Sequence, residues 1–400
     1  MVANNLLSPE TRALIRAQMS RRGFIAGVGG VGAAGLLAAC GTDSSPSETS
    51  AGVVDLSDKE KSVRWANWTL YLDYDEDAKN YPTLEALKKS SGLDISYKED
   101  VDDNNTFYGK VVGQLKLGQD IGYDIVTLTD WMAARWIRLG YTQAIDEAAI
   151  PNKKNILPAL ANVSFDPGRK NSLTWQSGFA GLGWNKELLP KGVHTLDDLF
   201  APANKGRIEV LSEMRDTMGI IMQYQGVDPS GQFTEDQFMN AIDFLQKQIS
   251  DGFIRQVKGN SYSEDLISGD AAAVIGWSGD LFILAMENQD KFEFAIPESG
   301  GTLWSDNLMI PSTSAHKKNA ETLMNYYYEP AVAAQVAAYV NYICPVEGAQ
   351  AEMEKIDPDL AKSPYIFPDA ATLAKVKVFA GLTPADETKY ESAFQKAIGN

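Results

Sequence analysis

The chain has few of the residues from which metal centres, disulfide scaffolds and nucleophilic active sites are built. Its 400 residues include two cysteines, Cys40 and Cys344, and two histidines, His194 and His316. Two cysteines cannot form a multi-cysteine zinc site or a disulfide framework. The histidines lie far apart and have no neighbouring cysteine or serine motif, so we expect structural or surface roles for both. We predict no metal site.

Motifs typical of nucleotide-dependent enzymes, hydrolases and calcium-binding proteins are also missing. The sequence has no Walker A pattern, no HExxH, no GxSxG and no EF-hand loop. A GxGxxG spacing occurs at residues 27–32, but it does not follow a strand, as a dinucleotide fingerprint must. We therefore expect no cofactor, no covalent chemistry and no enzyme, while a hydrolase with an unrecognised carboxylate pair stays open as an alternative.

Basic residues are scarce relative to acidic ones. Lysine and arginine number 36 against 53 aspartates and glutamates, which gives a net charge of −17. Residues 1–39 hold four of the arginines and one glutamate, so the rest of the chain carries 52 acids, 32 bases and a charge of −20. This balance argues against nucleic-acid binding, because affinity for phosphates comes from clustered lysine and arginine. It favours cationic partners through long-range attraction.

No apolar run is long enough to cross a bilayer comfortably, since a spanning helix needs about 20 residues. Residues 26–39 form a small apolar stretch of 14 residues that follows Arg21 and Arg22 and ends at Cys40. A charged segment before a short apolar one is typical of an export signal, and the paired arginines resemble the twin-arginine type. The sequence LAAC at residues 37–40 resembles the bacterial lipobox, in which the cysteine is lipidated. We predict a signal peptide over residues 1–39 and lipidation of Cys40.

Residues 40–61 are predicted to be a flexible tether. The segment 41–51 (GTDSSPSETSA) is rich in small and polar residues and cannot form a core. A coil of about 20 residues would reach roughly 25 Å from the membrane. Cys344 then has no partner for a disulfide and is expected to be a buried or inert thiol. We expect an exported monomer, anchored by lipid to the outer face of the cytoplasmic membrane.

Beyond residue 61 the sequence alternates between strand and helix patterns. Predicted strands include residues 62–67, 94–98, 124–128, 207–211 and 272–277, and predicted helices include residues 84–89, 105–117, 130–139, 217–225 and 235–250. Such alternation favours parallel sheets with helices on both faces. Two passages, residues 172–185 and 302–310, are extended and lack a helical stripe.

The simplest architecture is an α/β fold of two lobes joined by these extended crossings, one near Trp175 and one near Trp304. We assign residues 62–176 and 305–350 to the first lobe, and residues 177–304 and 351–400 to the second. Ligands of open parallel sheets bind at the carboxyl ends of strands, so a cleft between the lobes would collect loops from both.

Aromatic and acidic residues follow the predicted strands at the positions where a cleft would receive them. They are Trp68 and Tyr71; Thr129, Asp130 and Trp131; Glu213 and Asp216; Trp277; and Trp304 and Asp306. Each of these residues, taken alone, has a structural interpretation. A lone tryptophan is more often a core residue, and acids at the start of a helix can complement the helix dipole. Their joint placement is what favours a binding site.

These residue types match an organic cation. A cation over a tryptophan or tyrosine ring gains about 0.5–2 kcal/mol, and charge-assisted hydrogen bonds to carboxylates are stronger than neutral ones. Methylene groups lying against indole rings gain about 0.8 kcal/mol each on burial. A slot with acids at intervals and tryptophans as walls therefore suits a long, thin polycation.

From residue 62 to about residue 390 the chain resembles the polyamine-binding (spermidine/putrescine-binding) substrate-binding proteins of ABC transporters. The resemblance is carried by residues 67–71 (NWTLY), 123–126, 175–185, 300–307 (GGTLWSDN), 329–330 and 368–370. It implies a bilobal periplasmic-binding-protein type II fold with a ligand cleft between the lobes. It also implies a polyamine ligand and delivery to the permease subunits of an ABC importer.

The resemblance assigns ligand contacts to ten residues. Trp68, Tyr71, Trp277, Trp304 and Asp306 match the family pattern, Tyr342 fits its last tyrosine, Thr129 replaces a small hydroxyl residue, Trp131 replaces a tyrosine, and Glu213 and Asp216 match its acids after a one-residue shift. A family glutamine near the carboxyl end has no counterpart, and Phe379 stands in its vicinity.

Two alternatives remain open on the sequence. A receptor for a sugar or another small solute could use the same tryptophans as stacking platforms, and Asp306→Asn would then barely alter its affinity. An extracellular hydrolase would turn over a substrate and lose that activity on Glu213→Gln.

Overall fold

The structure, a computed structural model, describes residues 53–69, 71–75, 77–101, 104–259 and 261–399. The predicted signal peptide, Cys40 and the predicted tether up to residue 52 lie outside the described residues. Residues 53–61, which were also expected to be flexible tether, pack on the first lobe: Ser57 is buried, and the backbone N–H of Leu56 donates to the carbonyl oxygen of Ala315 at 2.7 Å. In the part of the chain that is described, no helix is both long enough and apolar enough to cross a membrane.

The amino-terminal part alternates strands and helices as predicted. Its elements are β1 (Ser62–Trp68), α2 (Pro82–Ser91), β2 (Asp94–Val101), α3 (Asn104–Lys116), β3 (Ile125–Thr129), α4 (Asp130–Arg138), η3 (Pro151–Asn155) and α5 (Pro158–Ala161). β1 pairs in parallel with β2 and with β3. Local chemistry sets the ends of α2: Pro82 opens the first turn, and Gly92 closes the helix with a left-handed φ of 71°.

The central part forms a second α/β unit. Its elements are β4 (Ser172–Asn185), α6 (Leu196–Leu199), η4 (Pro202–Asn204), β5 (Ile208–Leu211), α7 (Met214–Tyr224), α8 (Glu235–Ser250), β6 (Ile254–Lys258), α9 (Tyr262–Ser268), β7 (Ala273–Trp277), α10 (Ser278–Glu287) and β8 (Phe292–Ala295). β5 runs parallel to both β6 and β7. The predicted helix at residues 235–250 is confirmed as α8, which begins with a capping box formed by Thr234 and Gln237.

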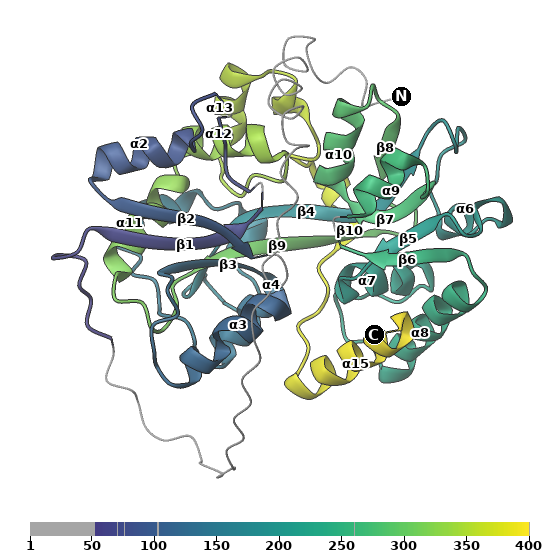
Figure 1. Ribbon diagram of the computed structural model, residues 1–400, viewed down its shortest axis with the longest axis horizontal. Helices are drawn as coiled ribbons and strands as arrows, with labels where there is room; N and C mark the ends of the chain where they lie inside the picture. Colours follow the sequence, from purple (N-terminus) through teal and green to yellow (C-terminus); the bar gives the residue numbers. More distant parts are fainter. Residues whose placement is uncertain (1–52, 70, 76, 102–103, 260, 400) are drawn as a thin grey trace, which may run out of the picture.

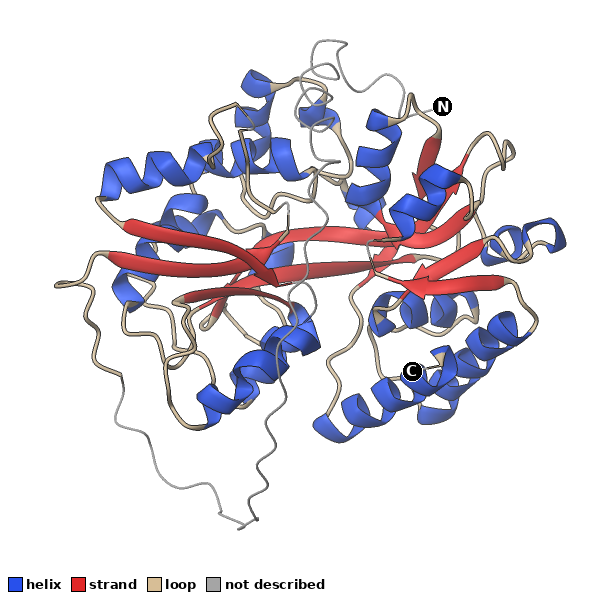
Figure 2. Cartoon of the chain, viewed as in Figure 1, coloured by secondary structure: helices blue, strands red, loops and turns tan. Residues whose placement is uncertain are grey.

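The last part of the chain returns to both units. Its elements are β9 (Gly301–Met309), α11 (Lys317–Tyr327), α12 (Pro330–Val340), α13 (Ala349–Ile356), η5 (Leu360–Lys362), α14 (Ala370–Leu373), β10 (Val376–Lys377) and α15 (Pro384–Ile398). Helices cover both faces of the strands (Figure 2).

Two long strands, β4 and β9, run through the middle of the molecule and join the two units (Figure 1). The main sheet has the order β2-β1-β3-β9-β4-β7-β5-β6, with β9 and β4 at its centre. β4 pairs antiparallel with β9 from Ser172↔Met309 to Ala180↔Thr302, and with β7 further along. The predicted extended crossings near Trp175 and Trp304 are therefore confirmed.

Each unit has its own hydrophobic core. The first lobe packs around two clusters, one with Trp65 and Trp175 and the other with Phe107 and Trp136. The second lobe packs around a separate cluster that includes Phe238. The prediction of an α/β fold with two lobes is confirmed.

The first lobe takes up more of the carboxyl end than the sequence boundary at residue 350 allowed. Met353, Leu360 and Ile366 are buried in its core, and only later residues such as Tyr390 and Phe394 pack in the second lobe. The physical reason is that α13 packs against α12, which belongs to the first lobe.

Candidate ligand-binding site

The predicted site residues lie at the ends of strands that meet near the centre of the sheet. Trp68 ends β1, Thr129 ends β3 and Trp277 ends β7. The remaining positions are the N-cap and first turn of α7 for Glu213 and Asp216, β9 for Trp304 and Asp306, the first turn of α4 for Trp131, and the loop after α12 for Tyr342. Because β3, β9, β4 and β7 are successive neighbours in the sheet, residues from both lobes converge here.

Asp306 is the acid at which the first lobe meets the crossing strand β9. Its Oδ2 accepts a hydrogen bond of 2.8 Å from the Tyr71 hydroxyl, and its Oδ1 accepts one of 2.7 Å from Thr129 Oγ1. The sheet register explains the second contact, since Thr129 is paired with Asp306 in the β3–β9 ladder. Tyr71 is held from behind, because Trp175 Nε1 donates to its carbonyl oxygen at 3.1 Å.

Burial dominates the electrostatics of Asp306, which is only 5% exposed. Removal from water raises the pKa of this carboxyl to about 7, against the effect of the hydrogen bonds from Thr129 and Tyr71, which lower it. The nearby charges of Asp130 and Asp216 raise it further. A cation placed against Asp306 would relieve this cost.

Asp216 is the corresponding acid of the second lobe. It lies in the first turn of α7, where its Oδ2 accepts a hydrogen bond of 2.8 Å from Trp277 Nε1 and its Oδ1 accepts one of 2.6 Å from Thr302 Oγ1. Burial raises its pKa, while these two hydrogen bonds lower it. Trp277 is thereby oriented by the acid rather than only by hydrophobic packing.

A third acid, Asp280, was missed on the sequence. Its Oδ1 accepts a hydrogen bond of 3.1 Å from the Tyr342 hydroxyl, and its Oδ2 accepts one of 2.9 Å from the Tyr262 hydroxyl. The available signal was its spacing, because Asp280 lies three residues after Trp277, in the first turn of α10. An acid after a strand-end aromatic residue is the same pattern that singled out the other positions.

Tyr342 connects the three acids. Its ring lies 6.0 Å from that of Tyr71 and 5.1 Å from that of Trp304, in edge-to-face arrangements. Burial first, and then the charges of Asp280, Asp306 and Asp216, hold the pKa of its hydroxyl well above the ordinary value. The same aromatic ring therefore borders Asp306 of the crossing strand β9 and two acids of the second lobe.

Glycines make room for these rings. A Cβ atom at Gly178 of β4 would lie 2.4 Å from the Trp304 ring, and one at Gly279 of α10 would lie 2.5 Å from the Tyr342 ring. Both distances are too short for a side chain. The 14 residues of β4 are all buried, and at Gly178 the aromatic rings packed against the strand leave no room for a side chain.

The indole nitrogens of Trp68 and Trp304 are buried without a hydrogen-bond partner among the described residues. Trp68 is partly buried and packs against both hydrophobic clusters of the first lobe. Buried N–H groups normally have a hydrogen-bond acceptor, so each of these two indole N–H groups is available to donate to a bound solute or water molecule.

Glu213 and Trp131 are engaged by the protein itself. The Arg215 guanidinium lies 4.2 Å from the centre of the Trp131 ring, and its Nη1 lies 3.7 Å from Glu213 Oε1. Burial raises the pKa of Glu213 to about 8, against the lowering effect of Arg215. Arg215 is thus interposed among the residues assigned to this part of the site, and ligand contacts at Glu213 and Trp131 stay predictions.

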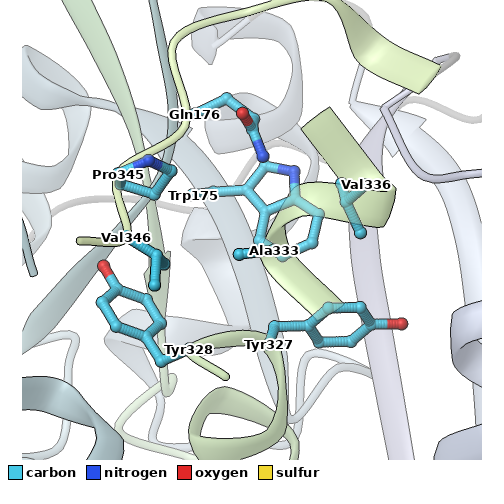
Figure 3. A pocket seen from close by; sticks show the side chains of 8 residues that line it. All are labelled: Trp175, Gln176, Tyr327, Tyr328, Ala333, Val336, Pro345 and Val346. Atoms are coloured by element: carbon cyan, nitrogen blue, oxygen red, sulfur yellow. The ribbon is translucent and has the colours of Figure 1, made fainter. Parts of the chain in front are cut away.

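A small cavity lies in the first lobe at the start of β4. It is lined by Trp175, Gln176, Tyr327, Tyr328, Ala333, Val336, Pro345 and Val346. Figure 3 shows Gln176 on one side of the Trp175 indole and the two tyrosines on the other. Its volume of about 10 Å³ has room for about one water molecule. The cavity is therefore too small to be the site for an organic solute.

The structure places the other reactive residues in structural surroundings. The ring of His194 lies 5.2 Å from that of Trp184. His316 is held between two acids, with Nδ1 lying 3.0 Å from Asp124 Oδ1 and Nε2 lying 3.0 Å from Glu60 Oε2. Cys344 is buried, and burial raises the pKa of its thiol to about 12. Within the described residues, no group of three His, Cys, Asp or Glu side chains is arranged to hold a metal ion.

Comparisons with known proteins agree with this architecture. Residues 58–368 match the family described as bacterial extracellular solute-binding protein. The spermidine/putrescine-binding periplasmic protein of Escherichia coli (strain K12) is 26% identical over 341 residues, which cover 85% of this chain and 92% of that protein. The putrescine-binding periplasmic protein PotF of the same organism is 25% identical over 339 residues, covering 80% and 87%.

Solved structures show the same fold. The substrate-binding protein PotD of the spermidine/putrescine ABC transporter from Streptococcus pneumoniae superimposes with a TM-score of 0.71 at 23% identity, covering 84% of this chain and 98% of that chain. The Tp0655 (TpPotD) lipoprotein of Treponema pallidum gives a TM-score of 0.71 at 20% identity, covering 84% and 99%. The predicted periplasmic-binding-protein type II fold is confirmed. The family match over most of the described chain shows that the protein belongs to the bacterial extracellular solute-binding proteins.

Proposed function

We propose that the protein captures polyamines such as putrescine and spermidine outside the cytoplasm and delivers them to an ABC importer. One observation carries the proposal: Asp216, Asp280 and Asp306 all lie around Tyr342, and two of them are buried. Within the part of the chain that the structure describes, neither Asp216 nor Asp306 forms an ion pair with a lysine or arginine side chain. Buried carboxylates require compensation, which a ligand ammonium group supplies.

The aromatic rings between the acids suit the apolar part of such a ligand. Trp304 and Tyr342 are in contact with each other, and Trp277 is fixed by its hydrogen bond to Asp216. Methylene groups lying on these rings gain about 0.8 kcal/mol each, and an ammonium group over a ring gains about 0.5–2 kcal/mol. The named functions of the two Escherichia coli relatives support the same ligand class.

Capture follows from the distribution of the acids between the lobes. Tyr71 and Thr129 of the first lobe hold Asp306, whereas Asp216 and Asp280 belong to the second lobe. A diamine that contacts both groups favours the arrangement in which the lobes are together, because only that arrangement offers it all its partners. Binding and release are then sufficient, and no covalent step is needed.

Export and anchoring form the second half of the proposal. Paired arginines, a short apolar stretch and Cys40 support export, cleavage and attachment of lipid to that cysteine. A lipid-anchored monomer on a flexible tether would remain close to the permease subunits that receive its ligand. One structural neighbour, from Treponema pallidum, is itself named a lipoprotein.

Calorimetric titration with putrescine, spermidine and a neutral disaccharide tests the proposed ligand class. We expect saturable binding of at least one amine and no binding of the disaccharide. Saturable binding of the disaccharide alone would overturn the polyamine assignment and favour a sugar receptor. Turnover of a candidate substrate that is lost on Glu213→Gln would favour a hydrolase.

A further inference from the structure

A group of charged residues around the buried carboxylate of Glu387 joins the two lobes beside the candidate site. Arg135 and Arg138 extend from α4 in the first lobe, and Glu387 extends from α15 in the second. Arg135 Nη2 lies 3.2 Å from Glu387 Oε1, and Arg138 Nη2 lies 3.3 Å from Glu387 Oε2. One carboxylate therefore receives two arginines from the opposite lobe. In the view of Figure 1, α4 and α15 both lie below the crossing strands.

Arg215 of α7 extends this group within the second lobe and across to the first. Its Nη2 lies 3.3 Å from Glu387 Oε1 and its Nη1 lies 2.8 Å from Glu391 Oε1. Its guanidinium also stacks at 4.2 Å on the ring of Trp131, which belongs to α4. Arg135 lies 5.0 Å from the same ring, so the indole is shared by arginines of both lobes.

The two helices that make this contact are each anchored in the hydrophobic core of their own lobe. α4 inserts Met132 and Trp136 into the core of the first lobe, while α15 inserts Tyr390 and Phe394 into the core of the second. Glu387 is 6% exposed. If the lobes part, Glu387 loses both arginines of α4 but keeps its contact with Arg215.

We propose that Glu387, with Arg135 and Arg138, forms an interlobe latch that sets ligand affinity without touching the ligand. This inference rests on the proposed function, in that the ligand is taken to bind between the lobes. The ion pairs exist only when the lobes are together, so their free energy adds to the closed state and not to the open one. The latch therefore slows ligand release, while the first encounter with the ligand is left unchanged.

Glu391 provides a matched control on the same helix. It lies one turn after Glu387 and pairs with Arg215 at 2.8 Å, within the second lobe. Glu391→Gln removes the same charge and an ion pair of the same arginine but no contact with α4. Arg138→Gln weakens the latch from the other lobe, because it removes one of the two arginines of α4 and leaves Arg135 in contact with Glu387. Arg138 is half-exposed, so a folding defect is not expected.

The test is stopped-flow tryptophan fluorescence with putrescine and spermidine, combined with small-angle X-ray scattering of the ligand-free proteins. Glu387→Gln is expected to raise the dissociation rate about tenfold, because it removes the buried partner of both arginines. Arg138→Gln is expected to raise it about threefold, because Arg138 is half-exposed and Arg135 keeps its contact with Glu387. Glu391→Gln should change the dissociation rate less than about twofold, because its ion pair with Arg215 lies within the second lobe and contributes equally to the open and closed states. The double variant Arg138→Gln/Glu387→Gln should release the ligand no faster than Glu387→Gln alone, because both substitutions act on the same ion pair.

Equal dissociation rates in wild type, Glu387→Gln and Arg138→Gln would overturn the latch, as would equal effects of Glu387→Gln and Glu391→Gln. If wild-type protein binds neither amine, the proposed function fails and the scattering data decide on the latch alone. A larger radius of gyration for Glu387→Gln than for Glu391→Gln then supports it, and equal radii overturn it.

Discussion

At the scale of single residues, Asp306 carries most of the argument, because it is buried and its two hydrogen-bond donors, Tyr71 and Thr129, are neutral. We expect Asp306→Asn to weaken putrescine binding about 100-fold or more, since removing one partner of a buried charge pair typically costs about 2–5 kcal/mol. Titration calorimetry measures the change. Asp120→Asn, at an exposed position of the same lobe, is the control for net charge.

A similar small loss in Asp306→Asn and Asp120→Asn would contradict this role, because it would show that only the overall negative charge attracts the ligand.

The raised pKa of Asp306 also predicts a pH dependence of ligand-free stability. Its pKa is about 7 in the folded protein and 3.8 as the ordinary value, so the folded state binds the proton more tightly. The stability from this group is complete below pH 3.8 and is lost as the pH rises to about 7. Thermal unfolding from pH 4 to 8 should therefore show wild type losing stability relative to Asp306→Asn, with the difference level above pH 7. A difference that is constant over this range would contradict the buried, uncompensated acid.

Sequence patterns place side chains that follow a strand at one edge of the sheet, but they do not reveal the partners that these side chains meet there. Asp216 and Asp306 lie beside Trp277 and Tyr71 because strand ends deliver neighbours to one edge of a sheet, and their contacts with a ligand stay predictions. Asp280 follows the strand-end residue Trp277 in the same way and was not singled out, and its hydrogen bond from Tyr342, 62 residues away, is not encoded locally. The stacking of Arg215 on Trp131 likewise joins two helices of different lobes, and no local pattern encodes it.

At the scale of elements, the crossing strand β4 holds the aromatic residues in place. Gly178→Ala would put a methyl group 2.4 Å from Trp304, so the ring and Tyr342 beside it must move. We expect ligand affinity to fall at least tenfold, which corresponds to about 1.4 kcal/mol. Calorimetric titration measures the affinity, and thermal unfolding of the same variant measures its stability.

Gly109→Ala is the control for this change. Gly109 lies within α3, where an added Cβ meets nothing within 4 Å, so a gain of about 0.5–1 kcal/mol in stability and unchanged binding are expected. Wild-type affinity in Gly178→Ala would show that Trp304 and Tyr342 do not line the binding site.

Element types could be predicted from periodicity, whereas their pairing could not. The extended passage at residues 172–185 is β4, and the predicted helix at 235–250 is α8. The sequence does not reveal that β4 pairs with β9, because that ladder joins residues more than 120 positions apart and its register depends on packing from both lobes. The same distance dependence explains why the sequence does not reveal that Leu360 and Ile366 pack in the cluster around Trp65 and Trp175.

At the scale of the whole molecule, a ligand between the lobes should couple their stabilities. The three acids are held by hydrogen-bond donors on both sides of the interlobe boundary: Tyr71 donates to Asp306, Trp277 to Asp216, and Tyr342 to Asp280. At a putrescine concentration 100 times the Kd, stabilisation by mass action is about 2.7 kcal/mol. Differential scanning calorimetry should show the unfolding of both lobes shifted to higher temperature. A shift of one of two transitions would mean that the ligand contacts a single lobe.

The central claim is that buried acids and aromatic rings of both lobes replace the water around an organic dication. A crystal structure of the protein with putrescine or spermidine tests it most directly. We expect one ammonium nitrogen within hydrogen-bonding distance of Asp306, the methylene chain against Trp304 and Tyr342, and another nitrogen near Asp216 or Asp280. The account would be contradicted if the amine were bound elsewhere on the protein and these side chains kept their contacts with one another, with no ligand between them.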